Sequence, residues 1–209
     1  MNKPICKFGE ARDGLIAEFA QKHLVGAKIL ELGCGSGGRT KLFHTISDRV
    51  IGIDIVDRVE DEHKSHFQFL LADARELPFK DNAFDAVVSF DVIEHIDDEE
   101  AFIAEAFRVL RKGKWLLLGT PNRLRLSNRL KALWSRKITY PYYLGSDTIH
   151  LREYMMDDLI ALVEKGGFIR IKPMHIWVGL VGRINLGLRK SPWFLNSYAQ
   201  YLLVVAHKQ

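Results

Sequence analysis

A glycine-rich turn follows an apolar run in the stretch from Ile29 to Gly38, which reads ILELGCGSGG. Gly33, Gly35 and Gly38 match the pattern G-x-G-x-x-G, in which backbone amides at the start of a helix bind the polar part of a nucleotide-like ligand. In such folds an acid about 20 residues further on hydrogen-bonds a ribose. Asp54 stands at that distance, so the pattern predicts a ligand that contains a ribose.

Acidic residues end four short apolar segments that are predicted to be strands. The four acids are Glu31, Asp54, Asp73 and Asp91. Because the carboxyl ends of parallel strands meet along one edge of a sheet, we expect these carboxylates to gather there. Their convergence indicates a ligand site more strongly than the glycine pattern does alone.

Short apolar runs typical of buried strands alternate with segments whose apolar residues recur at helical spacing. This order predicts a single α/β domain whose parallel sheet is covered by helices on both faces. The pattern loosens after residue 122. The predicted strands are 28–33, 49–54, 66–73, 84–91, 114–122, 168–176 and 198–208, and the predicted helices are 15–24, 40–46, 98–110, 126–134 and 157–164.

The kind of ligand is narrowed by Glu31, which stands two residues before the first glycine of the turn. A carboxylate there would repel the pyrophosphate of a dinucleotide but attract a ligand with an ammonium and a sulfonium group. Asp73 with Ala74 offers an acceptor to an adenine amino group. These residues favour S-adenosylmethionine over a nicotinamide dinucleotide, although a turn that serves only close packing would need the same glycines.

Five motifs follow one another between Ile29 and Phe168. They read ILELGCGSG, IGIDIVD, LLADARELPFKDNAFDAVVSFDVIEH, LRKGKWLLLGTPN and GSDTIHLREYMMDDLIALVEKGGF. As an ordered set they resemble the class I S-adenosylmethionine-dependent methyltransferases of the UbiE/UbiG-like group, methyltransferase type 11. The resemblance implies one domain over residues 1–209 with a Rossmann-like, seven-stranded, mostly parallel sheet, helices on both faces, a reversed last strand and a helical insertion after the fifth strand. It also implies S-adenosylmethionine as cofactor and S-adenosylhomocysteine as product.

The same resemblance, carried over position by position, implies the contacts of the cofactor. The glycines of the turn would lie against its methionine and ribose portions, and Asp54 would bind the ribose hydroxyls. Asp73 with the amide of Ala74 would bind adenine, while Phe90 and Asp91 would line the methionine end. The full set of expected cofactor-binding residues is Glu31, Gly33, Cys34, Gly35, Gly37, Asp54, Ile55, Asp73, Ala74, Phe90 and Asp91.

Two histidines, His95 and His150, are the candidates for a base that takes the proton of a hydroxyl acceptor. Some relatives bind a divalent metal through E-x-x-E-H and a later histidine, and the resemblance aligns Asp91, Glu94, His95 and His150 with that set. Asp91 shortens the first arm by one methylene, so we favour a site without metal, in which Glu94 and His95 cap and pack the turn after the fourth strand. Magnesium or manganese is the alternative.

Three segments are expected to face the methyl acceptor. They are the N-terminal helix and lid at 1–25, the basic insertion at 122–150 and the apolar segment at 176–197. The insertion joins a stripe of leucines and a tryptophan to six bases, Arg123, Arg125, Arg129, Lys131, Arg136 and Lys137. We expect a small hydrophobic or amphiphilic acceptor, with O-methylation favoured. The alternatives are an RNA methyltransferase, a nicotinamide-dependent oxidoreductase and a cofactor-binding protein without catalytic activity.

Charge is divided unevenly along the chain. Residues 1–105 hold 21 of the 26 acids but only 12 of the 30 bases, so the remaining residues are strongly basic. Such a division suits either an anionic partner or a solvated basic surface. We expect an anionic membrane surface rather than nucleic acid, because no nucleic-acid-binding module is recognised. With two cysteines and no apolar leader, a cytoplasmic location, peripheral to the membrane, is the expectation.

Overall fold

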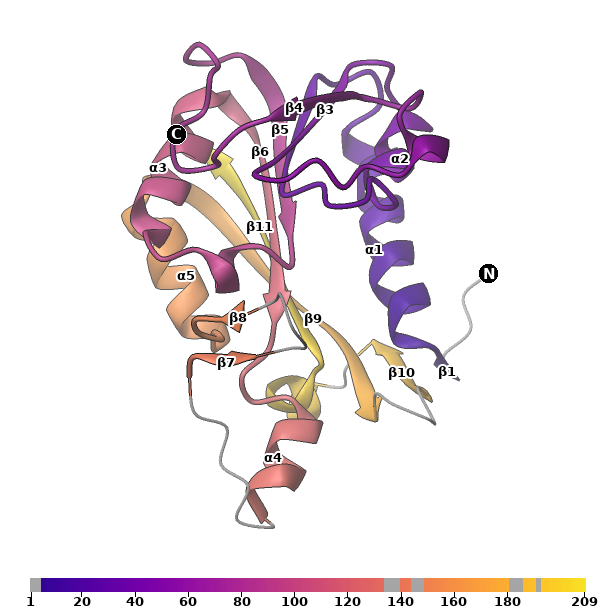
Figure 1. Cartoon of the computed structure of the whole chain (residues 1–209). Coiled ribbons are helices and arrows are strands. Elements are labelled where there is room, and N and C mark those ends of the chain that lie inside the picture. The colour runs from indigo at the N-terminus through magenta and orange to yellow at the C-terminus, as the bar shows by residue number, and fades with distance from the viewer. Residues whose placement is uncertain (1–4, 134–139, 144–148, 181–185, 191–192) are drawn as a thin grey trace.

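A computed structural model describes residues 5–133, 140–143, 149–180, 186–190 and 193–209. Nine strands of these residues form one twisted sheet through the middle of the molecule, in the order β1-β10-β9-β11-β6-β5-β2-β3-β4 (Figure 1). They are β1 (Ile5–Cys6), β2 (Ile29–Leu32), β3 (Val50–Asp54), β4 (Gln68–Leu71), β5 (Phe84–Phe90), β6 (Leu110–Pro121), β9 (Phe168–Leu180), β10 (Leu186–Lys190) and β11 (Tyr201–Lys208). A separate antiparallel pair consists of β7 (Tyr142–Tyr143) and β8 (Ile149–His150).

Helices cover both faces of this sheet, with α1 on one side and α3 and α5 on the other (Figure 1). They are α1 (Phe8–His23), α2 (Thr40–His44), α3 (Glu99–Val109), α4 (Leu126–Leu133) and α5 (Met156–Lys165), and the short 3-10 helices are η1 (Asp61–His63), η2 (Ile93–His95) and η3 (Trp193–Tyr198). Of the helices that the structure describes, none combines the length and the apolar character that crossing a bilayer requires.

The register of the central strands sets the position of the ligand edge. The strand β2 is buried at all four positions, and its ILEL sequence pairs in parallel with β3 and β5. Leu32, its last residue, lies opposite Ile53 of β3 and Ser89 of β5. The three strands therefore end at the same level, and the residues that follow them share one rim.

The last strand, β11, runs antiparallel to β6 and to β9, so the predicted reversed strand is confirmed. The prediction of seven strands was incomplete, because β1 and β10 extend the sheet beyond β9. Ile5 pairs with Leu188 and Cys6 with Gly187 in this extension. The two-residue β1 is too short to show any periodicity, and β10 falls in the glycine-rich segment where none was recognised.

Two hydrophobic clusters lie on opposite faces of the sheet. One contains Phe102 and Ile103 of α3, and the other contains Ile16 of α1 and Phe43 of α2. The helix α3 begins at the predicted place because the side chain of Asp98 accepts a hydrogen bond from the Ala101 amide at 2.9 Å. Its apolar residues then recur at helical spacing and face the sheet.

The predicted insertion contains α4, although Trp134, Arg136 and Lys137 lie outside the described residues. Arg125 does not lie on the surface, because only 8% of it is exposed and its guanidinium contacts the carboxylate of Glu153 at 2.6 Å. At least one base of this segment, Arg125, therefore stabilises the interior of the protein and does not contribute to a basic surface.

Trp177 anchors the N-terminal segment to the extended end of the sheet. It is fully buried and adopts a left-handed backbone with φ of 59°. Its indole Nε1 donates a hydrogen bond to the Cys6 carbonyl at 2.8 Å, and its ring lies 5.7 Å from that of Phe8. Expected from the sequence to face the acceptor, this side chain instead fixes the start of α1.

We expect Trp177→Ala to lower the free energy of unfolding by about 3–5 kcal/mol, because it removes a large buried side chain and leaves a cavity. The matched control is Trp193→Ala, since Trp193 is 84% exposed and its loss should change stability by no more than about 0.5 kcal/mol. Urea unfolding of both variants measures the difference. Equal losses in the two variants would contradict the anchoring role.

Candidate active site

A cleft of about 380 Å³ opens at the carboxyl edge of the parallel strands, and we name it the rim cleft. Three of the four acids predicted to converge, Asp54, Asp73 and Asp91, line it together. The convergence inferred from the strand pattern is therefore present in the fold. The other predicted site residues in its lining are Gly33, Gly35, Ile55, Ala74 and His95.

The glycine turn passes close to both neighbouring strands and to the cleft. Gly33 has a φ of 75°, and a Cβ there would lie 2.3 Å from a Val92 methyl carbon. Gly35 has a φ of 53°, and a Cβ there would meet nothing within 4 Å. Gly33 is therefore required by packing and conformation, whereas Gly35 leaves open space in front of its backbone, as a bound ligand would need.

Asp54 and Asp73 are oriented by local hydrogen bonds. Asp54 accepts from the Gly35 amide at 2.9 Å with one oxygen and from the Val56 amide at 3.2 Å with the other. Asp73 accepts from the backbone and the guanidinium of Arg75, and this hydrogen bonding lowers the pKa of the Asp73 carboxyl below its usual value. Both side chains are therefore held as acceptors at the cleft wall.

A second hollow of about 420 Å³ adjoins the rim cleft and shares Gly33, Gly35 and Asp91 with it. We name it the arginine pocket, because two guanidinium groups face it. Its lining also includes Arg12, Asp13, Glu31, Cys34, Arg39 and Phe90.

Asp91 joins three parts of the chain at the boundary of the two hollows. It adopts a left-handed backbone with φ of 60°, and its amide donates to the Gly119 carbonyl at 3.0 Å. One carboxylate oxygen accepts from Nη1 of Arg12 at 2.9 Å and from Nη2 of Arg39 at 3.0 Å. A strained residue held by so many contacts is typical of functional sites. Neither arginine lies in a local sequence pattern that marks it as a site residue.

Glu31 lies at the base of the arginine pocket and is 1% exposed. Burial raises the pKa of its carboxyl to about 7, an effect that the charge of Arg39 partly offsets. Its Oε2 atom has no hydrogen-bond partner among the described residues. A cationic group beside it would favour the ionised form and supply that partner.

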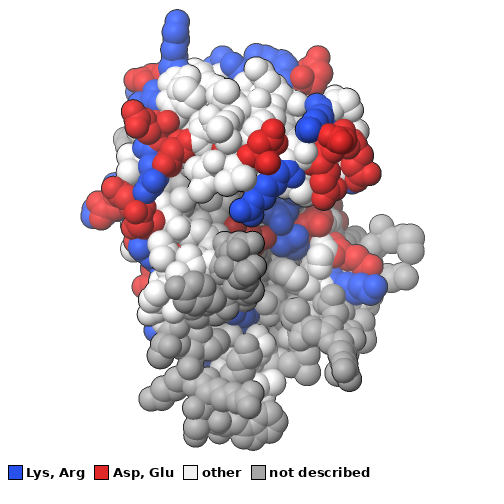
Figure 2. Space-filling view, in the orientation of Figure 1, with Lys and Arg blue, Asp and Glu red and all other residues white. Residues whose placement is uncertain are grey.

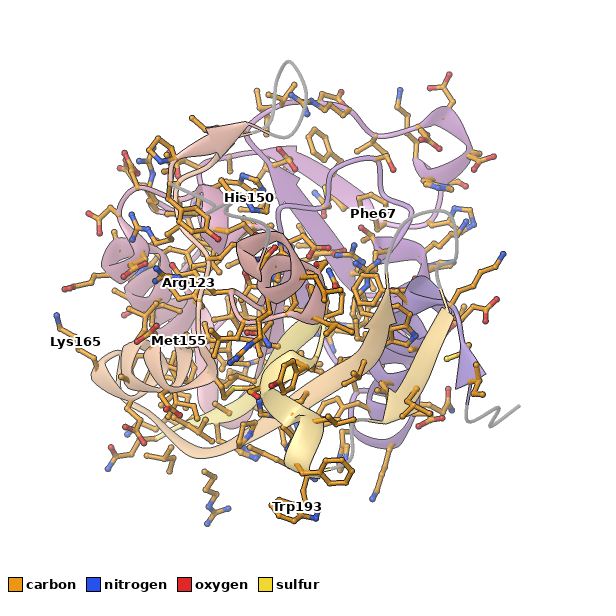
Figure 3. All side chains as sticks on the ribbon, turned by 90° about the horizontal axis from the view of Figure 1, so that it is seen from below. Phe67, Arg123, His150, Met155, Lys165 and Trp193 are labelled. Atoms are coloured by element: carbon orange, nitrogen blue, oxygen red, sulfur yellow. The ribbon has the colours of Figure 1, made fainter. Side chains whose placement is uncertain are left out.

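Two other residues expected to bind the cofactor, Cys34 and Gly37, have surroundings that indicate a packing role. Burial raises the pKa of the Cys34 thiol to about 12, consistent with a residue that packs and does no redox chemistry. Gly37 lies outside the linings of both hollows, and a Cβ there would lie 2.9 Å from the ring of Phe67. Gly37 therefore allows the turn to pack closely against Phe67, which is labelled in Figure 3.

The two candidate histidines contact one another. Their rings meet edge to face, with centroids 4.8 Å apart and an interplanar angle of 73°. Nδ1 of His95 lies 2.6 Å from the Ile149 carbonyl, and Nδ1 of His150 lies 3.2 Å from a carboxylate oxygen of Glu153. Because the Ile149 carbonyl accepts, the neutral ring of His95 carries its proton on Nδ1 and leaves Nε2 as an acceptor. Burial lowers the pKa of His95, which favours this neutral form.

Glu94 lies beside the two histidines and is fully buried. It accepts a hydrogen bond from the Thr120 hydroxyl at 2.9 Å, and burial raises the pKa of its carboxyl to about 8. One ligand atom each from Glu94, His95 and His150 lie within 4.8 Å of one another. Asp91, the fourth residue of the metal set considered from the sequence, faces the arginines. The other three could hold a divalent ion, since the Glu94 Oε1 atom has no partner among the described residues.

Glu153 is a buried hub that sequence reasoning missed. Its carboxylate accepts from Nη1 of Arg125 at 2.6 Å, the Asn128 amide at 3.1 Å and the Tyr140 hydroxyl at 2.7 Å. With the hydrogen bond from His150, it connects the insertion to a candidate base. Despite the opposing effect of burial, these hydrogen bonds lower the pKa of the Glu153 carboxyl to about 2. The carboxylate is thus ionised and orients the His150 ring.

Comparison with known proteins finds methyltransferases that are similar to this chain in sequence and in fold. The sequence model of a family described as methyltransferase domain matches residues 30–118. A "Probable S-adenosylmethionine-dependent methyltransferase" of Mycolicibacterium smegmatis is 34% identical over 150 residues, which are 68% of this chain and 52% of that protein. The mitochondrial ubiquinone biosynthesis O-methyltransferase of Bos taurus is 36% identical over 143 residues, 61% of this chain and 38% of the relative. The chain spans about half the length, or less, of these curated relatives.

The fold is shared more widely than the sequence. A solved S-adenosylmethionine-dependent methyltransferase from Mesorhizobium loti superposes with a TM-score of 0.70 at 15% identity, covering 96% of this chain and all of that one. At this identity the similarity shows the fold alone. It confirms the Rossmann-like architecture expected from the sequence.

We expect Glu153→Ala to lower the free energy of unfolding by about 3–5 kcal/mol, because it removes one partner of a buried ion pair. Glu153→Gln keeps the shape and should lose less. Glu164→Ala removes an exposed acid and should change stability by no more than about 0.5 kcal/mol. Urea unfolding of the three variants measures these differences. A Glu153→Ala variant as stable as Glu164→Ala would contradict the view that the buried contacts of Glu153 stabilise the fold.

Proposed function

We propose that this chain, which carries the methyltransferase domain of class I S-adenosylmethionine-dependent enzymes, transfers a methyl group to a small hydrophobic or amphiphilic acceptor, with a hydroxyl oxygen favoured. The observation that carries the proposal is the pairing of two adjoining hollows. The rim cleft is lined by carboxylates that local hydrogen bonds orient. The arginine pocket is lined by both basic and acidic side chains.

The rim cleft suits the adenosine part of S-adenosylmethionine. Asp54 already accepts from two backbone amides, and its remaining lone pairs can accept from the ribose hydroxyls. Asp73 and the Ala74 amide lie in the same lining, where they can bind the polar edge of adenine. The exposed Ile55 would cover the ring with an apolar surface.

The arginine pocket suits the methionine end, which carries an ammonium and a carboxylate. Arg12 and Arg39 can each turn a guanidinium donor toward the carboxylate, while Glu31 and Asp13 attract the ammonium. A pyrophosphate would meet these acids at close range. The mixed charge therefore supports S-adenosylmethionine over a nicotinamide dinucleotide.

The bound cofactor supplies an activated methyl on a sulfonium, so the chain has to align the acceptor, exclude water and accept a proton. His95 and His150 are the groups suited to the last task. His95 lines the rim cleft, keeps its Nδ1 proton in a hydrogen bond and would offer Nε2 to an acceptor hydroxyl, while the buried His150 packs against its ring. A histidine of lowered pKa, such as His95, is in the required neutral state at neutral pH.

A divalent metal is a second way to activate a hydroxyl at the same place. Glu94, His95 and His150 would hold it, and it would lower the pKa of the acceptor hydroxyl. We favour the histidines without metal, since the Asp91 carboxylate is engaged by Arg12 and Arg39. Unchanged methyl transfer after EDTA treatment would support this choice, and loss that manganese restores would contradict it.

The remaining alternatives predict different ligands and products. A nicotinamide oxidoreductase would bind NADH, an RNA methyltransferase would label RNA, and a non-catalytic cofactor-binding protein would label nothing. Calorimetry with S-adenosylhomocysteine and NADH tests the first. Incubation of a cell extract with tritiated S-adenosylmethionine, followed by separation of lipid, protein and RNA, tests the others.

We expect the affinity for S-adenosylmethionine to rise between about pH 5.5 and 7, by up to about tenfold per pH unit. The pKa of Glu31 in the free protein is raised to about 7, so below this pH a cationic ligand must displace a proton from the carboxyl. Glu31→Gln should bind more weakly at pH 7 and lose this dependence. Calorimetry at several pH values measures both effects.

The control for this series is Glu10→Gln, which removes an exposed acid of α1 and should keep the wild-type slope. A Glu31→Gln variant with an unchanged slope would show that another group titrates with the ligand.

A further inference from the structure

We propose that the end of the molecule formed by η3 and α4 docks on a phospholipid bilayer with anionic headgroups, into which Trp193 and Phe194 insert. These two side chains are named the aromatic tip. The proposal concerns a surface outside the candidate active site and holds whether or not the chain transfers methyl groups.

The aromatic tip is exposed to a degree that is unusual for large apolar side chains. Trp193 is 84% exposed and Phe194 is 62% exposed, and both stand at the start of η3. Viewed from below, Trp193 projects from the margin of the molecule, away from the ribbon and from His150 (Figure 3). Large aromatic side chains in such positions mark contact sites, and tryptophan is enriched where proteins meet the headgroups of a bilayer.

Two bases precede this tip along the chain. The sequence around it reads RKSPWF, so Arg189 and Lys190 precede Trp193 by four and three residues and lie no more than about 15 Å from it. From residue 165 to the C-terminus there is no acid. Arg129 of α4 adds a further base, with its guanidinium 4.7 Å from the ring centre of Tyr198 in η3.

The acid next to α4 is neutralised inside the protein. Glu153 is buried and pairs with Arg125, so its charge does not face the surrounding solvent. In Figure 2, the visible Asp and Glu side chains lie on the upper and middle parts of the described surface. Exposed aromatic rings at the same end as an exposed base such as Arg129 complement an anionic bilayer.

The geometry of the tip favours a bilayer over RNA. The two rings meet edge to face, with centroids 5.8 Å apart and an interplanar angle of 85°. They therefore share one apolar body and do not present parallel faces on which successive bases could stack. The nearby Leu130 of α4, 39% exposed, adds an aliphatic group that no base would stack on.

A bilayer contact at this end would reach the active site through α4. This helix follows Arg125, which contacts Glu153, and Glu153 in turn orients His150. Docking on α4 and η3 would thus hold the insertion in place next to the candidate base. An amphiphilic acceptor could then pass from the lipid to the site without crossing water.

Flotation of the full chain with vesicles tests the surface. We expect it to float with phosphatidylcholine vesicles that contain phosphatidylglycerol and to stay behind with phosphatidylcholine alone. The double variant Trp193→Ser/Phe194→Ser should lose at least about tenfold in affinity, and Arg129→Gln about fivefold. Tryptophan emission should shift to the blue on binding, and Trp193→Phe should abolish the shift.

Two matched variants control for general changes of the surface. Val25→Ser removes an apolar side chain that is 63% exposed at the opposite end of the strands, and Arg49→Gln removes an exposed base there. Both should float like the wild type. Binding of S-adenosylhomocysteine by calorimetry should be the same in all variants, which separates a failure of docking from a failure of the proposed function.

Four results would overturn the proposal. They are no flotation with either vesicle, flotation that the double variant retains, binding of a polyuridylate homopolymer that depends on the same two aromatic residues, and a concentration-dependent dimer whose formation alone shifts the Trp193 emission. The last two would assign the aromatic tip to RNA or to a second copy of the chain.

Discussion

The carboxylate of Asp91 and its two arginine partners hold the site together. Arg12 comes from α1, Arg39 from the turn that precedes α2, and Asp91 itself from the end of β5. The hydrogen bond from its amide to Gly119 adds β6 to the group. These charge-assisted contacts between partly buried side chains are directional. The position of α1, the course of the glycine turn and the boundary between the two hollows all depend on them.

The parts of the fold that follow local patterns were predictable from the sequence. Buried parallel strands appear as short apolar runs, and acids at their carboxyl ends share one edge because the topology requires it. Asp54 and Asp73 were found in this way. Arg12 and Arg39 were missed, because each meets Asp91 across 79 or 52 residues of chain with no local signature. In addition, α1 begins at Phe8, seven residues before the start of its recognised apolar pattern, so Arg12 was covered only by the broad N-terminal segment 1–25 and by no pattern of its own.

The basic half of the chain has two distinct roles that composition could not separate. Arg125 is withdrawn into the protein by Glu153, whereas Arg129 lies on the surface beside η3. Glu153 therefore accounts for the burial of Arg125. The two residues are 28 positions apart in the sequence, so no local pattern indicates that they pair. The net charge of a segment therefore overestimates the electrostatic potential at its surface, because a buried base that pairs with an acid contributes little to that potential.

The bond between the Trp177 indole and the Cys6 carbonyl joins residues that are 171 positions apart. A ribosome adds about 5–20 residues per second, so the first helix waits roughly ten to thirty seconds before its anchor is synthesised. During translation the start of α1 therefore lacks this contact until most of the chain has been made, although Asp91, the partner of Arg12, is made much earlier. The end of the sheet where β1 pairs with β10 can thus close only after residue 190 has been synthesised, so the two ends of the chain complete this part of the fold together.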